Sequence, residues 1–384
     1  MLANLPQPSA EALEHSAQLS ALIHRDIAQQ NGWIPFSRFM ELALYAPNLG
    51  YYSAGARKFG GAGDFTTAPE LSSLFGRTLA RQIADIMAAS KPQILELGAG
   101  SGKLAVDILG ELEKLNALPE RYSILEVSAD LRQRQSELVH QKIPQLADRV
   151  CWLDALPEKI TGAVIANEVL DALPAHLVYW SNGQILERGV VSNQQQFDWQ
   201  DRLPENENLL NLARAIAVPD DYLSEISPAA RGLVSSLSER LERGAMLFID
   251  YGFGEREYYH PQRNRGTLMC HYRHHAHDQP FYLPGLQDIT AHVDFTAMTE
   301  AAIDAGAHLY GYTSQAFFLM NSGILELLAE VSPDNLRDYL PLSSQVQKLT
   351  SPAEMGELFK VIALGKGIEQ PLRGFSRGDL SRML

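Results

Sequence analysis

The sequence predicts an α/β fold built on a doubly wound, mostly parallel β-sheet. Short apolar runs typical of strands recur along the chain, and amphipathic segments typical of helices separate them. Strands that alternate with helices in this way form parallel sheets with helices on both faces. The expected strands cover residues 93–97, 122–127, 151–153, 163–167 and 245–250, with closing strands at residues 316–320 and 359–364.

The segments outside this alternation are expected to be an N-terminal helical region and an inserted hairpin. Residues 15–30 and 37–44 have helical periodicity, and a glycine-rich loop follows at residues 55–64. Thr67 and Glu70 form a capping-box pattern, which predicts a helix with its apolar face directed to the core. A Ser-Asn-Gly turn inside residues 178–191 predicts a hairpin, and the polar stretch 203–228 is expected to be helical.

The composition is that of a globular enzyme, with 46% hydrophobic and 20% charged residues in a chain of 384. A net charge of −14 argues against nonspecific binding to nucleic acid or to an anionic membrane, and it favours a cationic partner. Two cysteines do not make a disulfide framework, and no apolar run reaches transmembrane length. Glu11 and Glu14 precede the first arginine, which is unlike a secretory or mitochondrial presequence. The sequence therefore predicts a cytoplasmic protein.

A glycine-rich turn follows the first core strand and reads Glu96-Leu97-Gly98-Ala99-Gly100-Ser101-Gly102. Because an amphipathic segment begins at Lys103, backbone can approach a nucleotide-like ligand at a helix N-terminus. A dinucleotide fingerprint would need glycine at position 103, and a P-loop would need glycine at position 97. The acidic-x-Gly-x-Gly-x-Gly form is seen in class I S-adenosylmethionine methyltransferases, and the Glu96 carboxylate suits the cationic end of that cofactor. The alternative is a turn whose glycines serve packing only.

Acids at the ends of the next two strands extend this prediction. Glu126 ends the second strand, where a carboxylate can bind ribose hydroxyls. Such an acid also occurs in NAD enzymes, so Glu126 indicates an adenosine ligand rather than methyl transfer itself. Asp154 follows the third strand and could accept a hydrogen bond from the adenine amino group; a helix cap or a solvated loop acid is the alternative.

The segment after the fourth strand reads Asn167-Glu168-Val169-Leu170-Asp171-Ala172-Leu173-Pro174. In doubly wound sheets the chemistry takes place beyond the carboxyl ends of the strands. Glu168 and Asp171 lie three residues apart, on one side of a helical turn, where they could hold one cation between them. A guanidinium held in this way is oriented for in-line attack on the methyl group of a sulfonium. The alternative is that both acids cap the next helix.

Two further strings contain candidate ligands. In residues 63–70, Phe65 could pack on a cofactor and the threonines could contact its carboxylate, unless the string is a plain loop with a helix cap. Four histidines lie between residues 271 and 277, but no cysteine pair or carboxylate spacing completes a zinc site, so no metal is expected. No Gly-x-Ser-x-Gly motif occurs, which leaves serine-triad hydrolysis unsupported.

Several strings match a known family, in order, across almost the whole chain. The strings at residues 63–70 and 167–174 are specific to it, and the others are residues 50–52, 95–102, 249–252, 266–268, 293–296 and 355–360. The sequence resembles the MidA-like methyltransferases, whose mitochondrial members are complex I assembly factors that dimethylate an arginine. The resemblance implies a class I methyltransferase (Rossmann-like) fold, with S-adenosylmethionine as cofactor and S-adenosylhomocysteine as product.

The expected organisation follows from these strings. Residues 1–90 are expected to close over the cofactor, residues 91–175 and 245–384 to form the core with an insertion at 322–355, and residues 176–244 to form the substrate side. The resemblance assigns the substrate-side, catalytic role to Asn167, Glu168 and Asp171. The expected cofactor-binding residues are Tyr52, Asp64, Phe65, Thr66, Thr67, Pro69, Glu96, Gly98, Ala99, Gly100, Gly102, Glu126, Val127, Asp154 and Asn167.

The function that these observations favour is methyl transfer from S-adenosylmethionine to a nitrogen, with an arginine of a partner protein as the expected acceptor. Arginine is implied only by the mitochondrial branch of the family. One alternative is a small-molecule methyltransferase, whose insertion closes over a metabolite. Another is a non-catalytic assembly factor that binds the cofactor to shape a protein-binding surface. The acceptor and the oligomeric state, a homodimer included, stay open at this point.

Overall fold

The computed structural model describes residues 5–53 and 67–384, which form two compact units. Unit 1 contains residues 5–53, 171–232 and 255–292, and unit 2 contains residues 67–170, 233–254 and 293–384. These limits differ from the expected segments. Residues 67–90 pack within unit 2, and residues 255–292 within unit 1.

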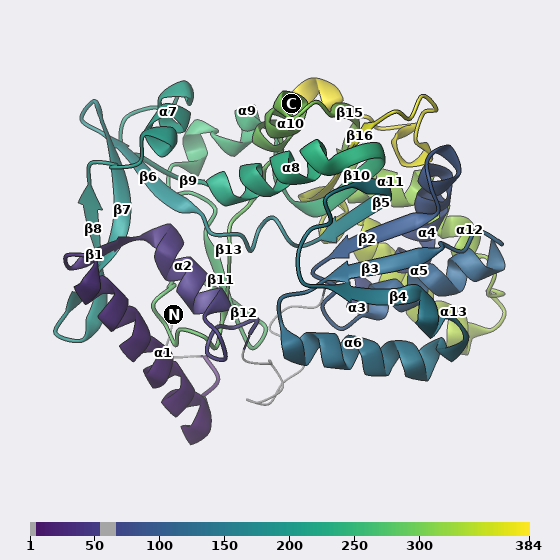
Figure 1. Ribbon diagram of the computed structural model, residues 1–384, viewed down its shortest axis with the longest axis horizontal. Helices are drawn as coiled ribbons and strands as arrows, with labels where there is room; N and C mark the ends of the chain where they lie inside the picture. The colour runs from purple at the N-terminus through teal and green to yellow at the C-terminus, as the bar shows by residue number, and fades with distance from the viewer. Residues whose placement is uncertain (1–4, 54–66) are drawn as a thin grey trace. The chain divides into compact units, whose positions relative to one another are not determined.

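Unit 2 is built on an eight-stranded sheet with the order β15-β16-β10-β5-β2-β3-β4, and β14 pairs with β10 (Figure 1). The strands from β10 to β4 are parallel, whereas β16 runs antiparallel to both of its neighbours. The predicted doubly wound, mostly parallel sheet is thus confirmed. The strands are β2 (Gln93–Leu97), β3 (Arg121–Leu125), β4 (Val150–Leu153), β5 (Ile160–Asn167), β10 (Leu241–Phe253), β14 (Val293–Asp294), β15 (His308–Ser314) and β16 (Phe359–Lys366).

Helices cover this sheet because each buries one apolar face against it. The α4 helix places Leu74, Phe75, Leu79 and Ile83 in the core of unit 2, and all four are buried. Figure 1 shows α6 running alongside β3 and β4. The helices of unit 2 are α3 (Ala68–Leu71), α4 (Ser73–Ala89), α5 (Lys103–Lys114), α6 (Ala129–Lys142), α10 (Phe295–Asp304), α11 (Gln315–Asn321), α12 (Ile324–Leu328), α13 (Leu336–Thr350) and α14 (Met355–Leu358); α8 (Pro228–Arg240) crosses the unit boundary.

Two local expectations in unit 2 were wrong. The single helix expected after Thr67 is broken at Ser72, whose extended backbone separates α3 from α4. The Ser72 hydroxyl, rather than that of Thr67, caps a helix, because it accepts from the Leu74 N–H. Residues 316–320, expected as a strand, lie in α11, which Ser314 caps; β15 precedes them and is the actual edge strand.

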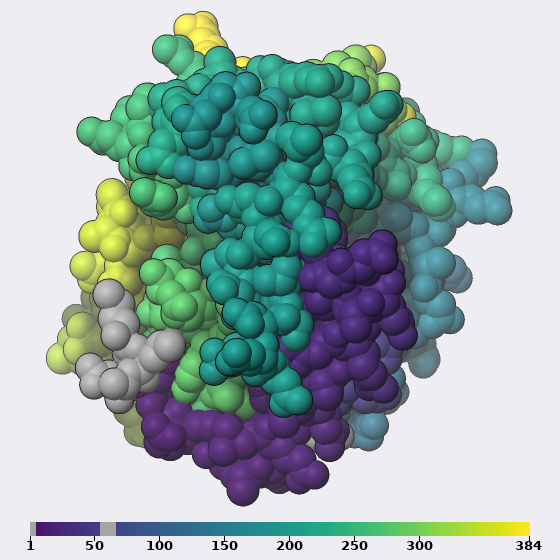
Figure 2. All heavy atoms as spheres, turned by 90° about the vertical axis from the view of Figure 1, so that its left-hand side faces the viewer, coloured from purple at the N-terminus to yellow at the C-terminus, as the bar shows by residue number. Residues whose placement is uncertain are grey.

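Unit 1 contains an antiparallel sheet with the order β1-β7-β6-β9, in which β8 pairs with β7. The expected hairpin is present as β6 and β7, which turn at Asn182 and Gly183. The stretch 203–228 holds both a helix and a strand rather than helix alone. Figure 2 shows one face of the molecule, on which N-terminal residues, coloured purple, and residues from the middle of the chain, coloured teal, share the surface. The strands are β1 (Trp33–Pro35), β6 (His176–Ser181), β7 (Gln184–Asn193), β8 (Gln196–Arg202), β9 (Tyr222–Ile226), β11 (Met269–Tyr272), β12 (His275–His277) and β13 (Asp288–Thr290), and the helices are α1 (Ala10–Gln29), α2 (Phe36–Tyr45), α7 (Glu207–Ala215) and α9 (Glu255–Tyr258).

A buried carboxylate explains the Gly266-Thr267-Leu268 string in unit 1. Glu225, which is 3% exposed, accepts hydrogen bonds from the backbone N–H groups of Thr267 and Leu268 and from the Thr267 hydroxyl. A Cβ on Gly266 would lie 2.2 Å from the Glu225 Oε1 atom, so this approach requires glycine. The string therefore has a structural role in unit 1.

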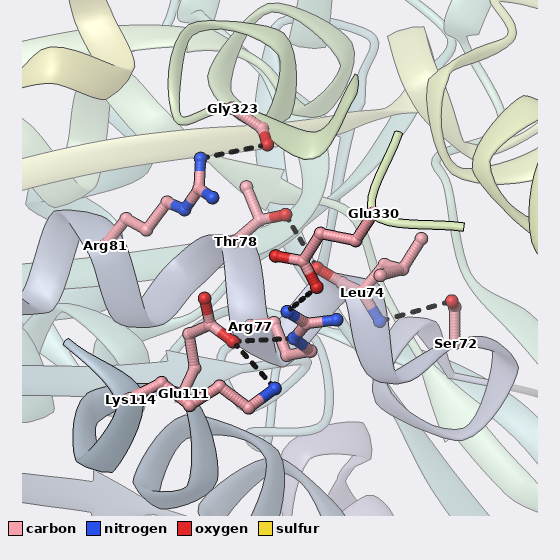
Figure 3. A network of polar contacts seen from close by, with 9 residues as sticks. All are labelled: Ser72, Leu74, Arg77, Thr78, Arg81, Glu111, Lys114, Gly323 and Glu330. Atoms are coloured by element: carbon pink, nitrogen blue, oxygen red, sulfur yellow. Dashed lines mark hydrogen bonds and ion pairs between the residues drawn. The ribbon is translucent and has the colours of Figure 1, made fainter. Parts of the chain in front are cut away.

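An ion-pair network in unit 2 joins α4 to α5 and to the turn after α12 (Figure 3). The Arg77 Nε atom lies 2.6 Å from the Glu111 carboxylate, and its Nη2 atom lies 2.7 Å from Glu330. Lys114 reaches the same oxygen of Glu111 at 3.6 Å. The side chain of Glu111 is 4% exposed and that of Glu330 is 49% exposed, so the two carboxylates differ in how far they depend on Arg77.

We predict that Arg77→Met destabilises the protein by about 3 kcal/mol, because it leaves the buried Glu111 charge with only the more distant Lys114. Glu330→Gln, which removes the exposed partner, should cost less than about 1 kcal/mol. Urea unfolding of both variants measures the difference. Equal small effects would show that Glu111 does not depend on this guanidinium.

Candidate functional site

The glycine turn between β2 and α5 has left-handed backbone at each of its three glycines. The φ angles are +62° at Gly98, +52° at Gly100 and +85° at Gly102. A Cβ on Gly100 would meet no atom of residues 5–53 and 67–384 within 4 Å, whereas one on Gly102 would lie 3.1 Å from the Cα of Gln135. Gly102 is thus needed for packing, while all three need the conformational freedom of glycine.

Glu96 lies near the end of β2 and is almost fully buried, at 2% exposure. The Tyr122 hydroxyl donates a hydrogen bond to its Oε2 atom at 2.8 Å. Burial raises the pKa of Glu96 to about 7; the Tyr122 hydrogen bond opposes this, and the charge of Glu126 adds to it. The side chain is therefore poised to change charge near neutral pH.

Glu126 follows β3 directly and is 5% exposed. Its Oε1 atom accepts from the Ser128 N–H at 3.0 Å, and its Oε2 atom accepts from the Gln135 amide at 3.2 Å. Burial raises the pKa of Glu126, and these two hydrogen bonds oppose the rise. The carboxylate is thus held in one orientation beside the glycine turn, whose Gly100 carbonyl accepts from the same Gln135 amide at 2.9 Å.

Val127 and Asp154 lie at the outer edge of this group. The Val127 side chain is 77% exposed, and the Asp154 side chain is 94% exposed. Arg132 donates to Asp154 at 2.6 Å and also to the backbone carbonyl groups of Glu126 and Leu153. Arg132 thereby joins the ends of β3 and β4, and Asp154 faces solvent with an arginine as its partner.

The turn after β5 has an unusual backbone. Glu168 has a φ of +52°, which is uncommon for a residue other than glycine. Its N–H donates to the Ile249 carbonyl at 2.9 Å, and the Leu170 N–H donates to the Asp250 carboxylate at 3.0 Å. The Asn167 amide donates to Glu168 Oε1 at 3.0 Å, so the side chains of this pair are also linked. Neighbouring β10 therefore fixes the turn.

Asp171 and Tyr52 belong to unit 1. Asp171 is 3% exposed, and its carbonyl accepts from the Ala291 N–H at 3.0 Å. The Tyr52 hydroxyl donates to both oxygens of Asp288, at 2.9 and 3.1 Å. The Tyr45 ring stacks on the Tyr52 ring, with 5.5 Å between the ring centroids. Burial raises the pKa of Tyr52 well above its usual range, and the negative charges of Asp288 and Asp171 contribute. Tyr52 thus lies in an aromatic and acidic cluster of unit 1.

The remaining expected residues precede α3 in the sequence or lie at its start. Asp64, Phe65 and Thr66 are outside the described residues. Thr67 precedes α3 and makes no side-chain cap. The Pro69 carbonyl accepts from the Lys103 ammonium at 2.7 Å, which connects α3 to the start of α5.

Sequence reasoning missed Gln135, Tyr122 and Asp250. Each is buried and bonds to a residue named above from a neighbouring element of unit 2. Asp250 lies within one of the matching strings, which was a usable signal. Gln135 and Tyr122 had none, because a glutamine on a helix and a tyrosine in a strand are common in any domain.

The residues of this edge of unit 2 fit S-adenosylmethionine. None of the described residues fills the space beside Gly100, and a buried carboxylate with two fixed oxygens is ready to accept from ribose hydroxyls. Among residues 5–53 and 67–384, no group of three or more His, Cys, Asp or Glu side chains converges as metal ligands would. None of the helices described is long and apolar enough to cross a membrane.

We predict that the stability of the folded protein falls as pH rises through about 7, in part because of Glu96. Its pKa is raised from 4.5 to about 7 in the folded state, so the folded protein binds the extra proton between these values. The contribution of Glu96 is complete below pH 4.5 and is lost as the pH rises through about 7. Glu96→Gln should therefore reduce the loss of unfolding free energy with rising pH, by roughly 3 kcal/mol at most.

Urea unfolding of both proteins between pH 5.5 and 8.5 measures this effect. Identical pH profiles for Glu96→Gln and the unmodified protein would contradict a raised pKa at this residue.

Known proteins resemble this chain over its whole length. Residues 78–313 match a family described as S-adenosyl-L-methionine-dependent methyltransferases. A solved protein from Burkholderia thailandensis with S-adenosylhomocysteine bound is 50% identical, with a TM-score of 0.96, over 99% of this chain and 100% of that one. Among curated relatives, the mitochondrial protein arginine methyltransferase NDUFAF7 homolog of Drosophila melanogaster is 29% identical over 97% of this chain and 91% of its own length. The mitochondrial NDUFAF7 of Danio rerio is 30% identical over 87% and 83%.

These findings confirm the fold class and the cofactor expected from the sequence, and they correct one prediction. The cytoplasmic location was wrong, since the curated relatives are named as mitochondrial proteins. The net charge of −14 is a poor guide to location, because the charge of a protein does not determine which compartment holds it. The family match covers more than half of the chain, and the chain belongs to the MidA-like family of S-adenosyl-L-methionine-dependent methyltransferases.

Proposed function

We propose that this methyltransferase acts on a guanidinium nitrogen of an arginine in a partner protein. The observation that carries the proposal is the turn after β5 in unit 2, where Glu168 follows the strand end in a backbone that is fixed by the hydrogen bonds of Glu168 and Leu170; a second acid, Asp171, follows in the chain. The curated relatives named above are protein arginine methyltransferases, which supports the same acceptor.

The two acids suit a cationic acceptor. An arginine presents a planar fork of donors that carboxylates bind in fixed geometry. Glu168 holds a carboxylate oxygen against the Asn167 amide, so the orientation of this side chain is restricted before any acceptor arrives. Asp171 is buried, and a carboxylate in that position interacts more strongly with a cation than one in water.

The chain contributes by positioning rather than by covalent chemistry. When bound, S-adenosylmethionine supplies an electrophilic methyl group on a sulfonium. The acids would orient the acceptor nitrogen, compensate its positive charge and accept the proton that the nitrogen loses. Orientation of this kind accounts for large rate effects, because a misplacement of about 1 Å can cost about a hundredfold in rate.

The experiment that tests the function uses labelled S-adenosylmethionine and a lysate of cells that lack this protein. Transfer of label to a protein, recovered as methylarginine after hydrolysis, is the expected result. Label in small molecules would support the metabolite alternative instead. Tight binding of S-adenosylhomocysteine without any transfer would support the non-catalytic alternative.

We predict that Glu168→Gln and Asp171→Asn each lower turnover by about a hundredfold while the affinity for S-adenosylhomocysteine stays within about twofold. Both changes keep the shape of the side chain and remove its charge. Glu158→Gln is the matched control, because Glu158 is an exposed acid in the loop before β5. Methyl transfer, cofactor affinity and melting temperature are measured on all three variants. Fully active, stable Glu168 and Asp171 variants would exclude the carboxylate pair as the acceptor site.

We also predict that Glu126→Ala lowers the affinity for S-adenosylhomocysteine about tenfold or more. The ribose hydroxyls would lose a charged acceptor, and hydrogen bonds to charged groups contribute roughly 1.5–3 kcal/mol. Calorimetry on the folded variant measures the loss. Unchanged affinity would mean that the ribose binds elsewhere.

A further inference from the structure

We propose that Gln135 is the positioning residue of the cofactor site, and that it orients the Glu126 carboxylate and the glycine turn for cofactor binding. Gln135 lies on α6 and is fully buried, with 0% exposure. Its side chain bonds to three different elements of unit 2: the glycine turn, the end of β3 and the strand β4. The proposal rests on Glu126 and the glycine turn as the cofactor-binding groups.

The hydrogen bonds determine the orientation of the Gln135 amide. The Trp152 indole N–H can only donate, and it lies 2.8 Å from the Gln135 Oε1 atom. The amide nitrogen must therefore face the other way, where it donates to the Gly100 carbonyl at 2.9 Å and to Glu126 Oε2 at 3.2 Å. Both of its N–H groups are used, and both acceptors are groups that hold the cofactor under the assignment above.

Gln135 is a polar residue on the buried face of α6, where apolar side chains normally pack. Gln135 and Val139 are the buried residues of α6, so the face that packs on the sheet contains a polar amide where an apolar side chain would be expected. A buried amide is costly unless it is hydrogen-bonded. The side chain also packs against the turn itself, since a Cβ on Gly102 would lie 3.3 Å from the Gln135 Cβ.

The consequence for the cofactor follows from the geometry of Glu126. Gln135 and Ser128 each occupy one oxygen of the carboxylate, which fixes the directions of the lone pairs that remain. The same amide holds the Gly100 carbonyl and so links the turn to the carboxylate, in addition to the backbone bond from the Gly98 N–H to the Leu125 carbonyl at 3.0 Å. Without it, the carboxylate keeps its charge but loses this orientation.

The test is a double-mutant cycle on the affinity for S-adenosylhomocysteine, measured by calorimetry. Gln135→Met keeps the length of the side chain and removes its hydrogen bonds, and it should weaken binding about tenfold. Gln133→Met is the matched control, since Gln133 is exposed on the same helix and bonds to Glu137. Because Gln135 acts through Glu126 and also through the Gly100 carbonyl, the double variant Glu126→Ala/Gln135→Met should lose less affinity than the product of the two single losses.

Three results would overturn the proposal: wild-type affinity in folded Gln135→Met, an equal loss in Gln133→Met, or single losses that multiply in the double variant. If Gln135→Met does not fold, Trp152→Phe replaces it, because that change removes the indole donor that orients the amide. Its affinity should fall about threefold, and an unchanged value would also overturn the proposal. The proposed function fails separately: unchanged binding in Glu126→Ala would reject the ribose assignment, and failure of methyl transfer to arginine would leave the Gln135 result intact.

Discussion

The hydrogen bonds around the Glu126 carboxylate are the interaction on which the rest of the cofactor edge depends. A carboxylate that is 5% exposed is unfavourable unless its oxygens are satisfied, and Ser128 and Gln135 satisfy one each. Gln135 bonds at the same time to the turn after β2 and to Trp152 on β4. The parallel order β2-β3-β4 brings these strand ends together. The sheet thus places the groups, and one amide fixes their orientation.

The parts of the fold that were predictable are those in which the pattern is local. The parallel strands β2, β3, β4, β5 and β10 are short apolar runs, and each was expected within a few residues of its observed bounds. Residues 316–320 were expected to form a strand because a short apolar run fits a strand or a buried helix equally well. In the structure Ser314 caps the helix α11, which contains these residues. In unit 1, β1 pairs with β7 across about 150 residues, and such pairing leaves no local signal.

The residues of the candidate site also differ in whether the sequence around them gives a local signal. Glu96, Glu126 and Glu168 were recognisable because each follows or ends a strand, where parallel sheets place ligands. Their roles in binding and catalysis stay predictions. Tyr122 bonds to Glu96, Gln135 bonds to Glu126, and Asp250 bonds to Leu170 beside Glu168, at separations of 26, 9 and 80 residues along the chain. No motif joins such residues, so only the folded structure shows that they meet.

The backbone of Glu168 links a residue that was recognisable from the sequence to residues of β10 that only the structure shows. A left-handed conformation at a residue other than glycine costs on the order of 1–3 kcal/mol, and it persists only where neighbouring structure holds it. Here the Glu168 N–H donates to the Ile249 carbonyl of β10, and two residues later the Leu170 N–H donates to the Asp250 carboxylate, which is 1% exposed. The alternative, that Glu168 and Asp171 cap the next helix, is wrong, because β6 and not a helix follows this turn. The strain is therefore better explained by the direction it gives the Glu168 side chain, and Asp250 is part of what makes that direction stable.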